Sequence, residues 1–104
     1  MLKKIYRLPS YCFKKIYHKG RTKVGRFVVV KSLRNFEDSS RFGIIISAKV
    51  VKKATKRNLI KRRISEIIGQ CLDRIHPKAD FVIIVKREAD FPTLKEEIER
   101  LLNV

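Results

Sequence analysis

The stretch that decides the fold is residues 52–75, KKATKRNLIKRRISEIIGQCLDRI. Apolar residues recur in it three and four positions apart, which predicts a long helix over about Ala54–Ile75 with one buried face. The residues of that face are Ile60, Ile64, Ile67, Ile68, Cys71 and Ile75. One side of this helix is therefore expected to lie in the core of the protein.

The first turns of the same helix are crowded with positive charge, and the first acid within it is Glu66. The basic residues are Lys52, Lys53, Lys56, Arg57, Lys61, Arg62 and Arg63. A cation near a helix N-terminus is unfavourable by ~0.3–1 kcal/mol, because that end is already positive. A surface helix that is merely solvated would interleave glutamate with its lysines. The pattern instead favours an anion site, and phosphate is the obvious anion.

Charge is distributed unevenly along the whole chain. The 104 residues include 26 Lys and Arg and 10 Asp and Glu, for a formal net charge of +16. Residues 1–63 contain 20 of the basic residues and two acids, Glu37 and Asp38, so this part carries +18 and the remainder −2. Self-repulsion of this size destabilises a small domain unless a polyanion relieves it, which favours a nucleic-acid partner.

The chain around the basic helix predicts strands and two more helices. A helix is expected over Ser10–Lys19, capped by Ser10 and ended by Gly20 in a left-handed turn. A final helix should start at Thr93, where Thr93 and Glu96 form a capping box. Strands are predicted at Arg21–Val24, Arg26–Leu33, Phe42–Lys49 and Phe81–Lys86, and His76-Pro77-Lys78 should end the long helix.

The order of these elements, α-β-β-β-α-β-α, predicts an α+β fold, a four-stranded mixed sheet with helices packed on it. The length of the chain and its apolar content of 44% are sufficient for one domain with a hydrophobic core over residues 1–104. No stretch approaches the ~18–20 apolar residues that cross a bilayer, and no secretory signal begins the chain, so no membrane partner is expected. The two cysteines, Cys12 and Cys71, are far apart and in no metal or redox spacing, which suits a reducing cytoplasm.

The residues of an enzyme active site are not apparent. His18 and His76 stand apart from any ligand spacing, and the four glycines are scattered rather than gathered in a phosphate-binding loop. The Glu37-Asp38 pair lies in a predicted loop, and Glu96, Glu97 and Glu99 are assigned to an ordinary helix face. A protein nuclease would need clustered carboxylates for metal ions or a histidine base. We therefore predict no catalytic and no metal-ligating residue.

Phe13 and Tyr17 lie one helical turn apart among the cations Lys14, Lys15 and Lys19. Two interpretations remain open. Both rings could pack the first helix onto the sheet, and for Phe13 this is as plausible as any other role. Alternatively they form a platform on which single-stranded bases stack, each stacked base contributing ~1–3 kcal/mol. Phe36, Phe42, Phe81, Phe91, Tyr6 and Tyr11 are assigned to the core or to surface packing.

Several segments resemble one known family. The run Ala54-Thr55-Lys56-Arg57-Asn58-Leu59-Ile60-Lys61-Arg62 is similar to the Arg-Asn-Arg signature helix of the bacterial ribonuclease P protein subunit, approximately A-x-x-R-N-x-x-K-R. The segments 13–21, 26–30, 41–44 and 80–87 resemble the family's first helix and its strands, in the same order. The chain departs from the pattern at Lys49-Val50-Val51-Lys52, where adjacent lysines and a glycine are usual, and at Ser65, where arginine is usual.

The resemblance implies a function. In this family the RNA subunit performs Mg²⁺-dependent hydrolysis of precursor tRNA, and the protein binds that RNA and the single-stranded 5′ leader of the substrate. The implied RNA contacts are Lys49, Lys52, Lys53, Lys56, Arg57, Asn58, Lys61, Arg62 and Arg63. The implied leader contacts are Phe13, Tyr17 and Lys31, the last in place of a frequent aromatic residue.

The resemblance also implies a left-handed strand–helix–strand crossover, although ~98% of parallel crossovers are right-handed. It further implies Mg²⁺ held mainly by the RNA subunit and the substrate, and a monomeric protein in a 1:1 complex. The main alternative is a small basic RNA-binding module, of the ribosomal-protein or RNA-chaperone type, with no role in cleavage. A stand-alone nuclease lacks its acidic residues, and a membrane-surface protein lacks an apolar insertion face beside its cations.

Overall fold

The protein is described by a computed structural model over residues 3–35, 39–75 and 78–104. Phe36, the Glu37-Asp38 loop and the His76-Pro77 break lie outside the described residues. The elements are η1 (Lys4–Tyr6), η2 (Ser10–Cys12), α1 (Phe13–Lys19), β1 (Arg21–Val24), β2 (Val28–Arg34), β3 (Arg41–Ile46), α2 (Ala54–Cys71), η3 (Leu72–Arg74), β4 (Ala79–Val85) and α3 (Phe91–Leu101). Here η denotes a 3₁₀ turn.

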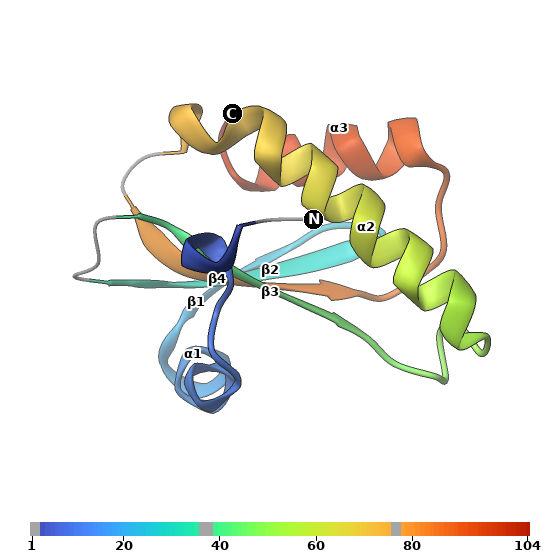
Figure 1. The fold of residues 1–104 in the computed structure, drawn as a ribbon, viewed down its shortest axis with the longest axis horizontal. Coiled ribbons are helices and arrows are strands. Elements are labelled where there is room, and N and C mark those ends of the chain that lie inside the picture. The colour runs from blue at the N-terminus through green and yellow to red at the C-terminus, as the bar shows by residue number, and fades with distance from the viewer. Residues whose placement is uncertain (1–2, 36–38, 76–77) are drawn as a thin grey trace.

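The four strands form one mixed sheet in the order β1-β2-β4-β3. β4 pairs antiparallel with β2 and parallel with β3, so α2 is the crossover between two parallel neighbours. α2 and α3 cover one face of the sheet, and α1 lies against the other (Figure 1). In that view α2 passes above the sheet from β3 in front to β4 behind, which is the left-handed sense. The predicted fold class is confirmed.

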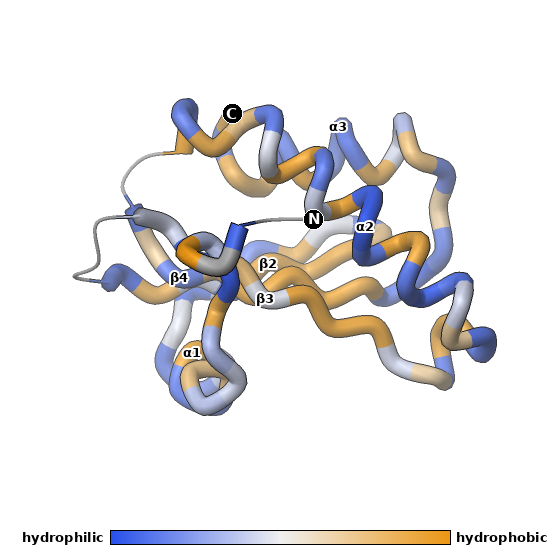
Figure 2. Tube along the Cα trace, viewed as in Figure 1, coloured by the Kyte–Doolittle hydropathy of each residue, from blue (hydrophilic) through white to orange (hydrophobic). Residues whose placement is uncertain are grey.

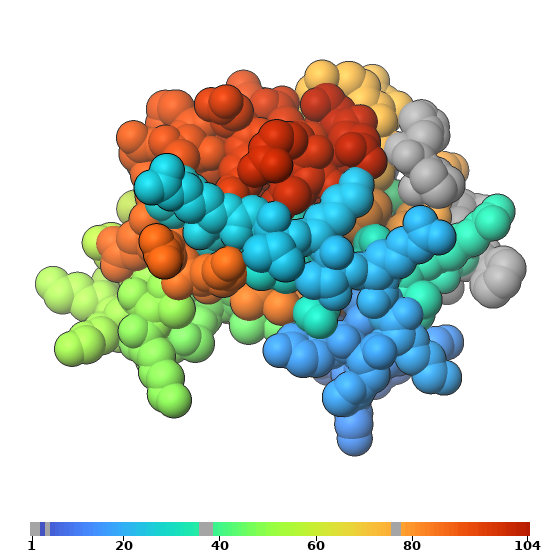
Figure 3. Space-filling view, turned by 180° about the vertical axis from the view of Figure 1, so that it is seen from behind, coloured from blue at the N-terminus to red at the C-terminus, as the bar shows by residue number. Residues whose placement is uncertain are grey.

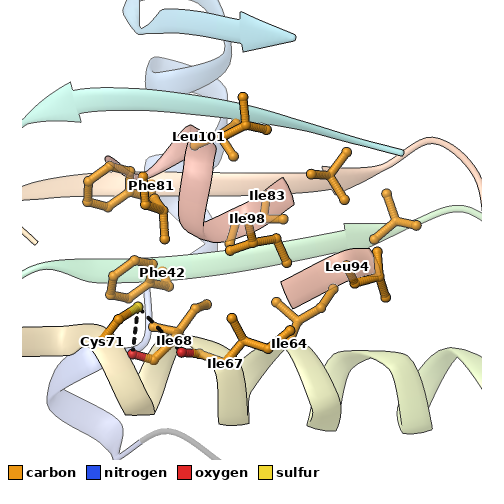
Figure 4. Packing of buried hydrophobic residues seen from close by; sticks show 14 of the residues in the cluster. Phe42, Ile64, Ile67, Ile68, Cys71, Phe81, Ile83, Leu94, Ile98 and Leu101 are labelled. Carbon is orange, nitrogen blue, oxygen red and sulfur yellow. Dashed lines mark hydrogen bonds between the residues drawn. The ribbon is translucent and has the colours of Figure 1, made fainter. Parts of the chain in front are cut away.

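The main core lies between α2, α3 and the sheet. The isoleucines of α2 point at β3 and β4 (Figure 4), where the rings of Phe42 and Phe81 stack with centroids 5.2 Å apart. Ile64 and Ile68 are fully buried, and each such side chain stabilises the fold by ~1.5–3 kcal/mol. Figure 2 shows the result along α2, where apolar and hydrophilic positions alternate from turn to turn. The predicted core face of the helix is confirmed.

Cys71 closes this core at the end of α2. Its thiol donates to the carbonyl oxygens of Ile67 and Ile68, at 3.4 and 3.5 Å. Burial raises the pKa of the Cys71 thiol, because the thiolate would lose its hydration. The side chain is therefore a protonated, small apolar residue, as its place in the helical pattern predicts.

A second, smaller core joins α1 to the other face of the sheet. It consists of Leu8, Ile16 and Val82, with Phe13 packed against them. The Phe13 ring lies over Gly43, and any Cβ at that position would collide with the ring. Gly20 is extended, with φ −75° and ψ 160°, so the predicted left-handed turn is wrong. Glycine is needed there because a Cβ would lie 2.7 Å from the Ser32 carbonyl oxygen.

The helix starts differ from the predicted caps. Asp90, not Thr93, caps α3 and accepts a 3.0 Å hydrogen bond from the Thr93 amide. Hydrogen bonds from Thr93 lower the pKa of the Asp90 carboxyl. Ser10 lies in η2 and does not cap α1, whose first helical residue is Phe13. An Asp three residues before Thr93 is the stronger acceptor, because its carboxylate is charged near the positive end of the helix.

Glu97 does not lie on an ordinary helix face, and that prediction is wrong. Its side chain is buried, 5% exposed, and its carboxylate accepts the backbone amides of Arg26, Phe27 and Val28. The Phe27 and Val28 bonds measure 2.8 and 3.1 Å. Gly25 is the sequence signal for this contact, since a Cβ there would meet the carboxylate. Glu97 thus fixes the turn between β1 and β2 from the far end of the chain.

Gly69 generates a stability prediction. It lies in the exposed part of α2, and a Cβ there would meet nothing within 4 Å. Gly69→Ala should therefore stabilise the protein by about 1 kcal/mol through helix propensity alone. Thermal unfolding should show a melting temperature higher by about 4 °C or more. Gly43→Ala is the control and should lower it, because the Phe13 ring fills that space. A lower melting temperature for Gly69→Ala would contradict the reasoning.

Candidate nucleic-acid interface

The connection between β3 and α2, residues 47–53, is folded tightly. The amides of Val50 and Val51 both donate to the Ser47 carbonyl at 3.1 Å, and the Val51 side chain is buried. Arg57 reaches back from the first turn of α2, and its guanidinium donates to the carbonyl oxygens of Val51 and Lys52, both at 2.8 Å. Arg57 therefore holds in place the backbone that carries the flanking lysines.

The N-terminus of α2 is not capped by a side chain. Lys53 occupies the cap position with extended backbone, and the first turn contains no acidic residue. The first amide groups of a helix have no partner within the helix. With lysines around them, these amides form a surface suited to an anion. The lysines therefore lie at the positive end of the helix dipole, which is the unfavourable arrangement that the sequence predicts.

The nine residues predicted to contact RNA gather around this end of α2. Seven are exposed, and Arg57 and Lys61 are half-buried. Lys56 forms an ion pair with Glu88, with Nζ 2.7 Å from Oε2, and the Arg63 guanidinium lies 5.5 Å from the centre of the Phe91 ring. Within residues 3–35, 39–75 and 78–104, no ion pair with a carboxylate joins the other predicted contacts, Lys49, Lys52, Lys53, Arg57, Lys61 and Arg62.

Ser65 lies one turn further along this surface. It is buried, 6% exposed, and its hydroxyl donates to the Lys61 carbonyl at 2.9 Å. A side chain buried to this extent is not accessible to a binding partner. The departure from the family's usual arginine therefore falls at the edge of the packed face, and the cationic surface ends at about Arg62 and Arg63.

A second surface lies on the open face of the sheet, beside α1. Tyr17 is 52% exposed, and the Lys31 ammonium lies 4.2 Å from the centre of its ring. The same ammonium donates to the Tyr17 carbonyl at 3.3 Å. Phe13 is half-buried and packs α1 onto the sheet. The structure thus brings Tyr17 and Lys31 together, and it supports the packing interpretation for the ring of Phe13.

Next to this pair runs an apolar row that the sequence analysis missed. Val24 pairs with Val29, Val29 with Ile84, and Ile84 with Ile45, so the four lie in register across the whole sheet. Val24 is 66% exposed and the other three are half-buried. The alternation of β2 was a signal for this row, but runs such as Ile44-Ile45-Ile46 resemble strands buried on both faces.

The open face is bordered on two sides. α1 and the connection before α2 project from the molecule as two separate parts, blue and green in Figure 3. Both extend to the side of the sheet opposite α3 (Figure 1). The result is a shallow groove with an apolar floor, a tyrosine and a lysine on one side and the cationic end of α2 on the other. Such a groove fits an extended chain with flat apolar groups and negative charges.

The described residues contain neither a candidate metal-binding cluster nor a candidate membrane-spanning helix. Among them, no three His, Cys, Asp or Glu side chains gather where they could hold a metal ion. None of the helices in this part of the chain is both long and apolar enough to cross a membrane.

Comparison with known proteins decides the family. The family model described as Ribonuclease P matches residues 2–104. The chain belongs to the ribonuclease P protein family. A ribonuclease P protein component from a Picosynechococcus species is 38% identical over 105 residues, covering 97% of this chain and 90% of that protein. One from Caldanaerobacter subterraneus is 36% identical over 94 residues, covering 88% and 80%.

Solved structures of ribonuclease P proteins share the fold. A mutant of the Staphylococcus aureus protein with defective mRNA degradation activity superimposes with a TM-score of 0.86 at 30% identity, covering 96% of this chain and 87% of that one. The Thermotoga maritima protein gives 0.83 at 30% identity, covering 94% and 96%. The chain is therefore a component of a ribonucleoprotein endoribonuclease, and its partner is the ribonuclease P RNA.

Two arginines of α2 should behave differently when replaced. Arg62→Ala removes an exposed cation that forms no ion pair among the described residues, so the free energy of unfolding should change by less than about 0.5 kcal/mol. Its binding to ribonuclease P RNA should weaken, and the slope of log affinity against log salt should become shallower by roughly 0.7–0.9. Filter binding across a salt series measures both.

Arg57→Ala is the matched comparison. It removes two hydrogen bonds to the connection before α2, so it should also destabilise the fold, by about 1 kcal/mol. Equal melting temperatures for the two variants would contradict the bracing role of Arg57. RNA affinity of Arg62→Ala equal to that of the unmodified protein would contradict the phosphate contact.

Proposed function

We propose that this chain, as one RNA-binding domain over residues 1–104, assists ribonuclease P in removing the 5′ leader of precursor tRNA. It binds the catalytic RNA through the start of α2 and the single-stranded leader across the open face of the sheet. The observation that carries the proposal is the uncapped N-terminus of α2, surrounded by exposed cations with no acid in its first turn. Clustered cations at a helix N-terminus suit a phosphate backbone.

The RNA subunit would meet the surface formed by Lys49, Lys52, Lys53, Lys56, Arg57, Asn58, Lys61, Arg62 and Arg63. Each phosphate that a cation neutralises releases condensed counterions, which is the main source of affinity. Asn58 is exposed between the cations and adds a neutral donor and acceptor. Arg57 contributes mainly by holding the connection in shape.

The leader would cross the groove beside α1. Tyr17 offers a half-exposed ring for stacking, and the apolar row through Val29 and Ile84 offers a floor for the next bases. Lys31 lies against the ring and supplies a cation for the backbone. Phe13 remains a proposed leader-binding residue. It would lie beneath the leader, where its ring packs α1 against the sheet.

The protein's contribution to the reaction is then positioning and electrostatics. We propose no catalytic residue in the chain. The Mg²⁺ ions of the hydrolysis would be held by the RNA subunit and the substrate. The protein would act as a monomer in a 1:1 complex in the cytoplasm, where both of its separated cysteines stay reduced.

Reconstitution tests the proposal directly. The protein should raise the cleavage of precursor tRNA by a bacterial ribonuclease P RNA at low Mg²⁺, and the protein alone should cleave nothing. The measurement is the rate of leader release on a gel. RNA binding without any stimulation would favour the small RNA-binding module. Protein-only cleavage that a chelator abolishes would favour a stand-alone nuclease.

Tyr17→Ala tests the leader groove. Loss of one stacked base costs ~1–3 kcal/mol, so the complex with ribonuclease P RNA should bind precursor tRNA at least about five-fold more weakly. Its affinity for mature tRNA, which lacks the leader, should not change. Tyr11→Ala is the matched control, because Tyr11 is also exposed but lies in η2, apart from Lys31. Equal losses for precursor and mature tRNA would count against the groove.

A further inference from the structure

Lys56 differs from the other residues predicted to contact RNA. It is the one of the nine that the described part of the chain joins to a carboxylate, at 2.7 Å from Glu88. Both side chains are about half exposed, 52% for Lys56 and 44% for Glu88. The negative charge of Glu88 therefore lies at the edge of the cationic surface.

The backbone that carries Glu88 is held at both ends. On one side the amides of Lys86 and Arg87 donate to the Phe27 carbonyl at 2.8 and 3.2 Å. On the other side Asp90 caps α3. Glu88 thus projects from a short, anchored connection between β4 and α3, and its carboxylate stays near α2.

A phosphate bound to Lys56 would compete with this carboxylate. An exposed ion pair is weak, so the ammonium can exchange partners at little cost. The displaced carboxylate would remain well within the ~8 Å over which charges interact at physiological salt, and it would repel the phosphate. The ion pair and the repulsion both oppose the binding of RNA at this point.

We propose that Glu88 is an internal competitor for the RNA phosphate at Lys56 and sets the affinity of this surface below its maximum. The inference rests on the proposed function, because it assumes that the start of α2 meets RNA. On binding, Lys56 leaves Glu88 for a phosphate, and Glu88 limits how tightly that phosphate is held. Removing the carboxylate's charge should therefore strengthen binding, the opposite of what replacing a contact residue does.

The test is the affinity of Glu88→Gln for ribonuclease P RNA at 0.1 M salt. We expect binding roughly two- to five-fold tighter than for the unmodified protein. The difference should shrink as the salt concentration is raised, because salt screens the repulsion between the displaced carboxylate and the phosphate. Glu96→Gln is the matched control, because it makes the same change of charge on the exposed face of α3 and should alter binding less.

A Lys56→Gln background makes the test specific. Without the ammonium there is no pair to break, so Glu88→Gln should improve binding less there than in the unmodified protein. The coupling between the two substitutions measures the competition itself. A melting curve for each variant shows that differences in folding do not account for the result.

Three outcomes would overturn the inference. Glu88→Gln and Glu96→Gln could improve binding equally, which would make the effect one of net charge. Glu88→Gln could weaken binding, which would show that Glu88 orients Lys56 toward the RNA. The gain could also be undiminished in the Lys56→Gln background. Failure of the proposed function is a separate result, because it is seen with the unmodified protein, which would then bind ribonuclease P RNA without stimulating cleavage or would not bind it at all.

Discussion

The burial of one face of α2 is the constraint on which the rest of the structure depends. The same helix that places Ile64, Ile67 and Ile68 in the core also gathers mutually repelling cations at its start. Repulsion between exposed charges is weak and screened by salt, whereas each buried isoleucine contributes ~1.5–3 kcal/mol. The burial of the core therefore outweighs the repulsion between the cations. It holds the cationic surface in a fixed shape before any partner binds, although the helix dipole disfavours cations at this end.

The sheet links the cationic surface at the start of α2 to the groove beside α1. β3 leads directly into the connection before α2, and its neighbour β4 supplies Ile84 to the floor of the groove beside α1. Two buried carboxylates tighten the frame. Asp80 receives the Arg41 guanidinium through two 2.8 Å hydrogen bonds and the Asn35 amide at 2.6 Å, and Glu97 holds the turn before β2. The cationic end and the groove are thus both attached to the same sheet.

Much of this could be predicted from the sequence, because the governing patterns are local. The isoleucine periodicity predicts α2 and its buried face, and the β-branched runs predict all four strands to within a few residues. The caps were predicted less well, since Asp90 and Thr93 are both capping residue types, and Asp90, the stronger acceptor, takes the cap position. Gly20 was assigned a left-handed turn, when the approach of another strand was what required glycine.

The larger errors concern contacts between distant parts of the chain. Nothing near Glu97 in the sequence shows that it binds amides about 70 residues away, and nothing near Lys56 shows the carboxylate of Glu88 beside it. Ser65 is buried because the edge of the packed face of α2 extends over it, which its polar residue type does not indicate. The cationic residues themselves were identifiable because charge clustering is visible in one dimension.

The place of β4 has a consequence for how the chain is made. β4 lies between β2 and β3 in the sheet, although it follows both in the sequence. β2 and β3 therefore cannot be joined until residues 79–85 have been synthesised, and pairing between such distant segments is slow. By then residues 1–63, with 20 of the 26 basic side chains, have been made. The growing chain thus carries most of its positive charge beside ribosomal RNA while its sheet is still open.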